Sequence, residues 1–247
     1  MCHGRCSTTL MLAAVLLVAA PPAAAERQRA VIEAVQRSVI SSELSARIES
    51  LPRREGEAFV AGEPLVEMAC AVYRAEQNKV EIRLRQARRK LENRKRLEEL
   101  DSVGRLAVDL ARLDVRESEA ELDIVTLNVE RCTIEAPFDG RVVERRAREH
   151  QSVQRQQEVL EIVGMALEAR IIVPAQWLAW LEPGAPVEIA VDETGARIDG
   201  AIERIGAAVD PVSHTVPVWA SLDGVSAALR PGMSGSARFP GRPGDGS

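Results

Sequence analysis

The chain has 247 residues, carries a formal net charge of −5 and contains only 3% aromatic residues. This length permits one to three small domains. A mildly acidic chain with few aromatic rings argues against nucleic-acid binding, which requires a basic face and stacking rings.

Residues 1–25 predict a secretory signal peptide. Arg5 supplies a basic start, the apolar run TTLMLAAVLLVAA follows, and PPAAA provides the small residues needed for cleavage after Ala25. The apolar run is too short for a stable membrane span. We therefore expect an exported chain that is soluble or peripheral to a membrane.

Residues 26–69 predict short β-strands. Apolar and polar residues alternate with a period of two in AVIEAVQRSVISSELSARIESL. Gly56, Gly62 and Pro64 mark turns in the stretch that follows.

Residues 70–132 predict two antiparallel helices. The segment has no proline, and Gly104 is its only glycine. The sequence Asp101-Ser102-Val103-Gly104 interrupts the helical pattern near the middle. In the second helix, steps of three and four residues predict a heptad seam formed by Val103, Leu106, Leu110, Leu113, Glu117, Ala120, Ile124 and Leu127. In the first helix, a less regular set of residues fits the same spacing: Tyr73, Val80, Leu84, Ala87 and Leu91.

The charges of the two predicted helices are complementary. Residues 83–96 are mainly basic and residues 109–123 mainly acidic, so an antiparallel pair would lay them side by side. A phosphate-binding basic helix is the alternative, but the chain already contains an acidic partner for the basic stretch.

Residues 133–164 predict a second small β-unit that begins with TIEAPFDGRVVE and has a turn at Asp139-Gly140. Residues 46–68 align with residues 140–162 without a gap. The aligned pairs include Arg47 with Arg141, Glu55 with Glu149, Glu67 with Glu161, Ile48 with Val142 and Phe59 with Val153. Two similar units of this size predict one small sandwich, with the helices inserted between its halves.

Residues 165–240 contain short strands separated by turn signals such as Pro183-Gly184 and Pro231-Gly232, which predict a small sheet or barrel. Residues 241–247 have the composition of a disordered tail.

Several stretches together resemble the periplasmic adaptor (membrane fusion) proteins of the HlyD type. They are SSELSARIESLPRREGEAFVAGEPLVEM, the helical segment, TIEAPFDGRVVE, DPVSHTVPVWASL and LRPGMSGSARF. The resemblance implies an α+β, mostly β fold: a split biotinyl-lipoyl-like sandwich, an inserted coiled-coil hairpin and a small β-barrel. The expected boundaries are 1–25 signal peptide, 26–45 N-terminal barrel-associated strands, 46–69 first lipoyl-like half, 70–132 hairpin, 133–164 second half, 165–240 barrel and 241–247 tail.

Two features depart from the family pattern. His150 and Gln156 stand where the lipoyl halves usually have a turn glycine, and a histidine can adopt the left-handed conformation at some cost. The family also often continues past the barrel into a membrane-proximal β-domain, and we expect that domain to be absent or truncated here.

The hairpin tip is the expected partner contact. In adaptors of tripartite pumps an Arg, a Leu and a Ser at the tip meet the outer-membrane duct. Arg96 and Leu100 match this pattern, but Ala107 stands in place of the serine. The alternative is that these residues are merely solvated or part of the helix seam.

Cys70 and Cys132 remain after signal removal, and they flank the predicted hairpin at its base. An even pair of cysteines in an oxidising compartment predicts a disulfide. The alternative is two buried thiols.

No cofactor or metal site is expected. The three lysines, Lys79, Lys90 and Lys95, all lie in the first predicted helix, so neither half-domain offers a lysine for a lipoyl or biotinyl group. The histidines and methionines are scattered, which argues against a metal site. Asp210, Ser213 and His214 are close in sequence, but the favoured interpretation is a turn rather than a catalytic triad.

The sequence therefore predicts a non-enzymatic adaptor in the periplasm, held at the inner membrane through its transporter. Its expected partners are an inner-membrane transporter of the resistance-nodulation-division or ATP-driven class, an outer-membrane channel, and further copies of itself in a trimer or hexamer. The alternative is a secreted coiled-coil scaffold with no role in transport.

Overall fold

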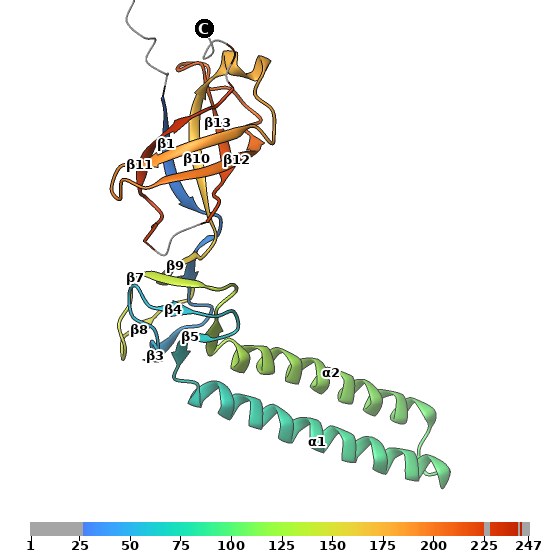
Figure 1. Cartoon of the computed structure of the whole chain (residues 1–247). Helices are drawn as coiled ribbons and strands as arrows, with labels where there is room; N and C mark the ends of the chain where they lie inside the picture. The colour runs from blue at the N-terminus through green and yellow to red at the C-terminus, as the bar shows by residue number, and fades with distance from the viewer. Residues whose placement is uncertain (1–26, 225–227, 242, 244–247) are drawn as a thin grey trace, which may run out of the picture.

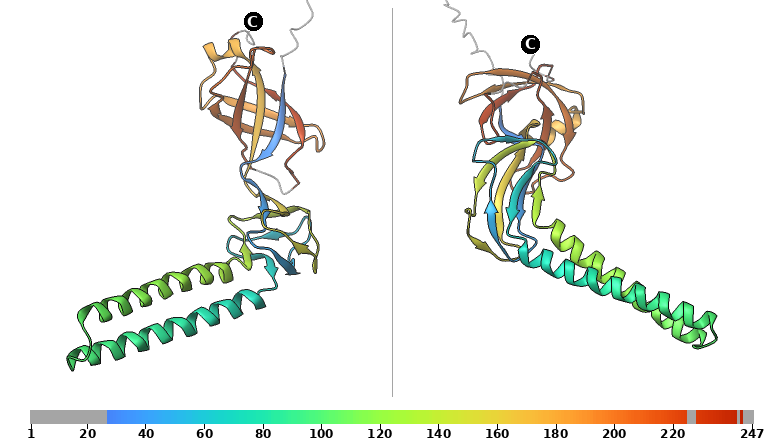
Figure 2. Two further views of the ribbon diagram at one scale, coloured as in Figure 1. Left: turned by 180° about the vertical axis from the view of Figure 1, so that it is seen from behind. Right: turned by 90° about the horizontal axis from the view of Figure 1, so that it is seen from below.

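The computed structural model describes residues 27–224, 228–241 and 243. The predicted signal peptide and most of the predicted tail lie outside these residues. Figures 1 and 2 show three parts in a row: a β-barrel, a small β-sandwich and a pair of long helices that projects from the sandwich at the end away from the barrel.

The barrel is closed by six antiparallel strands in the order β1-β10-β13-β12-β11-β14. Their bounds are β1 Gln28–Ala34, β10 Leu167–Pro174, β11 Pro186–Val191, β12 Arg197–Ile205, β13 Thr215–Ser221 and β14 Ser234–Arg238. Alternate residues of β11 and β13 are buried, the period-two pattern of strands with one face on a core. The short 3₁₀ helix Ala175–Ala179 adds the buried Trp177 to this core. The predicted barrel is thus confirmed.

The sandwich consists of two four-stranded sheets in the orders β2-β9-β7-β4 and β6-β5-β3-β8. The bounds are β2 Arg37–Ser41, β3 Ala46–Ser50, β4 Ala58–Phe59, β5 Pro64–Met68, β6 Thr133–Glu135, β7 Gly140–Arg145, β8 Ser152–Val153 and β9 Glu158–Gly164. Each sheet draws strands from both sides of the helical insertion, so neither half could bury its apolar face alone.

The two halves exchange equivalent hydrogen bonds. The Gly56 N–H donates to the Val142 carbonyl (2.8 Å), and the His150 N–H donates to the Ile48 carbonyl (2.9 Å). Corresponding residues of the two halves differ by 94 in number, so Gly56 corresponds to His150 and Ile48 to Val142. The two hydrogen bonds are therefore equivalent. The pair Gly62 to Ala136 (2.8 Å) and Gln156 to Ser42 (2.7 Å) obeys the same rule. The ungapped alignment in the sequence therefore reflects an internal pseudo-twofold relation.

The turns at His150 and Gln156 keep the backbone conformation of their glycine counterparts. Their φ angles are 66° and 67°, against 83° and 81° at Gly56 and Gly62. Side chains other than glycine pay roughly 1–2 kcal/mol for this left-handed conformation. The hydrogen bonds described above hold these turns in place.

Gly140 in the APFDGRV element is required by close packing. It begins β7 in extended backbone, where a Cβ atom would lie 2.3 Å from the Val163 carbonyl oxygen and 2.8 Å from the Phe59 ring. The preceding Asp139 accepts a hydrogen bond from the Ala61 N–H (2.8 Å). The element therefore locks β7 between β4 and β9.

The expectation that residues 26–45 associate with the barrel needs correction. β1 belongs to the barrel, but β2 pairs with β9 in the sandwich. The pseudo-twofold relation explains the split, because β2 beside β9 is equivalent to β6 beside β5. Only Val35, which lies in a bend, and Gln36 separate β1 from β2, so the chain passes directly from the barrel into the sandwich.

Candidate partner interface

The helix pair consists of α1 (Ala71–Glu99) and α2 (Arg105–Glu130), which run side by side in opposite directions (Figure 2). Val80, Leu84 and Ala87 of α1 are buried against α2, and Leu91 packs against the same cluster. These residues belong to the pattern expected for the first helix.

The seam predicted for the second helix is wrong. Val103 lies in the connecting loop, and the remaining seam residues are exposed: Leu106, Leu110, Leu113, Glu117, Ala120, Ile124 and Leu127. The face buried against α1 is formed by Val108, Ala111, Val115, Ser118 and Val125. Leu110 is two residues from Val108, which places it about 200° around the helix. Both faces have heptad spacing, so spacing alone could not identify the one that meets α1.

Three ion pairs join the basic stretch of α1 to the acidic stretch of α2. They are Arg83–Glu121 (2.5 Å), Arg88–Glu119 (2.9 Å) and Lys90–Asp114 (2.7 Å). All six side chains are exposed, and pairs of this kind contribute roughly 0.2–1 kcal/mol each. Their main effect is to fix the register of the two helices.

A disulfide between Cys70 and Cys132 closes the base of the helix pair. Cys70 is the N-cap residue of α1, and Cys132 lies two residues after the end of α2. The Cα atoms are 5.8 Å apart, and both residues are buried in the sandwich core. The disulfide therefore anchors both helices where they leave the sandwich.

The tip of the pair brings together the three residues predicted as a partner contact. Arg96 lies in the last turn of α1 and binds Glu92, Leu100 is the C-cap residue, and Ala107 lies in the first turn of α2. Leu100 is 72% exposed. This places an apolar side chain in solvent at the point farthest from the sandwich.

Two backbone hydrogen bonds close the tip of the helix pair. Asp101 adopts φ 53°, and the N–H groups of Asp101 and Ser102 donate to the carbonyls of Glu98 (2.9 Å) and Leu97 (2.8 Å). These two bonds form a Schellman motif, in which the left-handed position is usually glycine. The motif fixes the backbone on both sides of Leu100.

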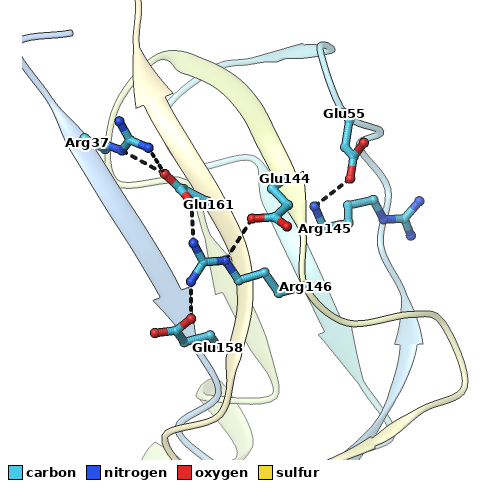
Figure 3. Close-up of polar contacts among 7 residues, drawn as sticks. All are labelled: Arg37, Glu55, Glu144, Arg145, Arg146, Glu158 and Glu161. Carbon is cyan, nitrogen blue, oxygen red and sulfur yellow. Dashed lines mark hydrogen bonds and ion pairs between the residues drawn. The ribbon is translucent and has the colours of Figure 1, made fainter. Parts of the chain in front are cut away.

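A charged network on the sandwich was not predicted from the sequence (Figure 3). Glu161 of β9 has a side chain only 6% exposed and binds both Arg37 of β2 and Arg146. Arg146 also binds Glu144 (3.1 Å) and Glu158. Because β2 and β9 lead directly into barrel strands β1 and β10, the network fixes the two strands that join sandwich and barrel. The available signal was Glu161, which interrupts the apolar run VLEIV.

The pKa of the Glu161 carboxyl is lowered, chiefly by its hydrogen bond to Arg37 and also by Arg146, against an opposing effect of burial. A carboxyl with a lowered folded pKa stabilises the fold above its unfolded pKa, and this contribution is lost as the pH falls through the folded pKa. We expect Glu161→Gln to lower the melting temperature at pH 7 and to flatten its decline below about pH 4.5.

Thermal unfolding from pH 7 to pH 3 measures this effect. Glu158→Gln is the matched control, because it removes a half-exposed carboxylate from the same Arg146 and its ion pair is weakened by solvent. Equal pH dependence in Glu161→Gln and the wild type would contradict the role of Glu161.

Within the described residues, no group of three or more His, Cys, Asp or Glu side chains could hold a metal ion. Asp210 accepts hydrogen bonds from the N–H groups of Ser213 (2.8 Å) and Val212 (2.9 Å), which lower the pKa of its carboxyl. The Asp210, Ser213 and His214 segment is therefore a turn between barrel strands, as predicted. Neither α1 nor α2 is long and apolar enough to cross a membrane.

The family model of CusB-like β-barrel domains matches residues 169–243, which cover the barrel from β10 onward. A search of curated proteins by sequence found no match.

Solved structures with the same fold cover most of the chain. The membrane fusion protein Spr0693 from Streptococcus pneumoniae is similar with a TM-score of 0.72 and 17% identity over 87% of this chain and 98% of its own. A MacA–MexA chimera carrying the α-hairpin domain of Pseudomonas aeruginosa MexA has a TM-score of 0.74 and 18% identity, over 87% of this chain and 80% of its own. MacA from Actinobacillus actinomycetemcomitans has a TM-score of 0.62 and 16% identity, over 87% of this chain and 77% of its own. The resemblance to membrane fusion (periplasmic adaptor) proteins is thus confirmed: the chain has their fold, and residues 169–243 match the CusB-like β-barrel model.

Proposed function

We propose that this chain is the periplasmic adaptor subunit of a tripartite efflux or secretion system, linking an inner-membrane transporter to an outer-membrane duct. The observation that carries the proposal is the separation of two surfaces. The exposed tip at Leu100 and the closed barrel lie at opposite ends of the molecule, joined by the sandwich (Figure 1). A chain of this shape can contact two partners at once, and it acts by binding rather than by chemistry.

The sandwich is then a biotinyl-lipoyl-like domain split by a coiled-coil hairpin. The pseudo-twofold exchange of hydrogen bonds between its halves supports this assignment. Its turns carry no lysine, so the domain serves as a mount for the hairpin and holds no cofactor.

The predicted signal peptide and the disulfide support a periplasmic location, because disulfides persist in oxidising compartments. The chain would be held at the inner membrane by its transporter, of the resistance-nodulation-division or ATP-driven class. It would act as a trimer or hexamer around the duct.

Cross-linking in the cell envelope tests the proposal. A tagged chain should co-purify with both an inner-membrane transporter and an outer-membrane channel. Recovery of neither partner would favour the secreted scaffold instead.

A further inference from the structure

A cleft lies between the sandwich and the barrel, where β9 leads into β10 (Figure 1). Its volume is about 680 Å³, within the range of pockets that hold one drug-sized molecule. The sandwich lines it with residues of β2, β7 and β9, and the barrel with the first residue of β10 and residues 229–231 ahead of β14. Three of the lining residues are arginines, and none of the described residues that line it is acidic.

One row of side chains forms the cationic part of the cleft. Val163 of β9 pairs with Arg37 of β2 on one side and with Arg141 of β7 on the other. Directly paired residues of antiparallel strands project from the same face of a sheet, so the two arginines flank Val163 on one face. Neighbouring strands are roughly 4.8 Å apart, which places the backbones of the two arginines about 10 Å apart. Their long side chains can therefore reach a single anionic group above Val163.

Both arginines keep hydrogen-bonding capacity for a ligand. Arg37 uses its Nε and Nη2 atoms for Glu161, which leaves Nη1 without a partner among the described residues. Its side chain is still 64% exposed. Arg141 donates from Nη1 to the Gly56 carbonyl (3.0 Å) and makes no ion pair with any residue that the structure describes. A cleft lined by one sign of charge concentrates ions of the opposite sign, so this one attracts an anion.

The rest of the lining is mainly apolar. Val143 of β7 and Met165, which follows β9, are 43% and 52% exposed. Leu167, Leu229 and Pro231 supply the wall on the barrel side. Covering such side chains with an apolar chain removes their surface from water, which favours binding. The lining therefore suits a molecule with one anionic group and an apolar body.

We propose that the cleft binds a single-chain amphiphile with an anionic carboxylate head. The carboxylate lies between Arg37 and Arg141, and the apolar chain lies against Val143, Met165 and the barrel wall. A molecule in this position contacts sandwich and barrel at once, so its binding favours one orientation of the two parts. The cleft has room for one such molecule, which makes the occupant a free amphiphile and not a bilayer surface. Binding at this cleft does not require the proposed transport function.

Isothermal titration of the purified chain, without its predicted signal peptide, with decanoate below its micelle concentration tests the proposal. Decanoate should bind saturably, with one molecule per chain. Hexanoate should bind about tenfold more weakly or less, because it buries a shorter chain. Decanol should also lose about tenfold or more, because it has the same chain without the charge. No saturable binding of decanoate, or equal affinity for decanol, would overturn the proposal, as would sedimentation of the chain with phosphatidylglycerol vesicles that requires Arg141.

Matched variants locate the site. Arg141→Gln and Val143→Glu should each weaken decanoate binding about tenfold or more, the first by removing a charged donor and the second by adding a like charge. Arg155→Gln and Val72→Glu make the same changes at exposed positions outside the cleft and should bind as the wild type does. Leu113→Glu, on the exposed face of α2, should also leave binding unchanged. Unchanged binding in both cleft variants, or a loss in any of the other three, would contradict the cleft as the site.

Discussion

Arg96→Glu combined with Leu100→Asp should abolish capture of the outer-membrane channel while capture of the inner-membrane transporter continues. The Leu100 side chain is exposed next to the Schellman motif, and Arg96 lies one turn before it. Central interface residues contribute roughly 2 kcal/mol or more each, about thirtyfold in affinity. If the two effects add, binding to the channel falls about a thousandfold.

The matched control applies the same chemical changes elsewhere. Arg155→Glu with Val60→Asp alters two exposed residues in turns of the sandwich, far from the tip. It should capture both partners as the wild type does. Circular dichroism should show native helix content in both variants, because every altered side chain is exposed. Normal channel capture by the tip variant would remove the tip from consideration.

The fold was largely predictable because its signals are local or repeated. The turn glycines and alternating residues indicate strands, and the long stretch without proline indicates the helices. The 94-residue repeat reveals the sandwich because equivalent residues make equivalent hydrogen bonds, as Gly56 and His150 do. The cysteines could be paired because the base of two antiparallel helices brings their ends together.

The inner face of α2 could not be predicted because the sequence offers two faces of equal spacing. The larger leucines made the outer one more prominent. The structure instead buries smaller residues of α2 against α1: Val108, Ala111, Val115, Ser118 and Val125. For α2 the preference for bulky residues at a seam was therefore misleading, because its leucines Leu106, Leu110, Leu113 and Leu127 are exposed.

The charged network was missed for a different reason. Arg37 and Glu161 are 124 residues apart, and their pairing depends on β2 joining the sandwich rather than the barrel. No local sequence pattern indicates that β2 joins the sandwich rather than the barrel. Once β2 is placed, a Glu in the apolar strand β9 requires a cation nearby, because a buried carboxylate without one is costly.

Replacing both cysteines by alanine (Cys70→Ala with Cys132→Ala) should destabilise the sandwich and helix pair by about 4 kcal/mol. The disulfide closes a loop of 62 residues, and in the chain-entropy model its loss releases that much conformational entropy in the unfolded state. With a urea dependence of about 2 kcal/mol per molar, the midpoint should fall by roughly 2 M. The folded structure should survive, because ion pairs and the buried face of α2 still hold the helices together.

The molecule contains its own control for this prediction. All three tryptophans, Trp177, Trp180 and Trp219, lie in the barrel, whereas both long helices lie beyond the sandwich. Urea unfolding followed at 222 nm should therefore shift, while unfolding followed by tryptophan fluorescence should not. Reduced wild-type protein should match the alanine variant, since it loses the same bond but keeps both sulfur atoms. An unchanged midpoint at 222 nm would contradict a stabilising disulfide, and equal shifts of both signals would show that barrel and sandwich unfold as one unit.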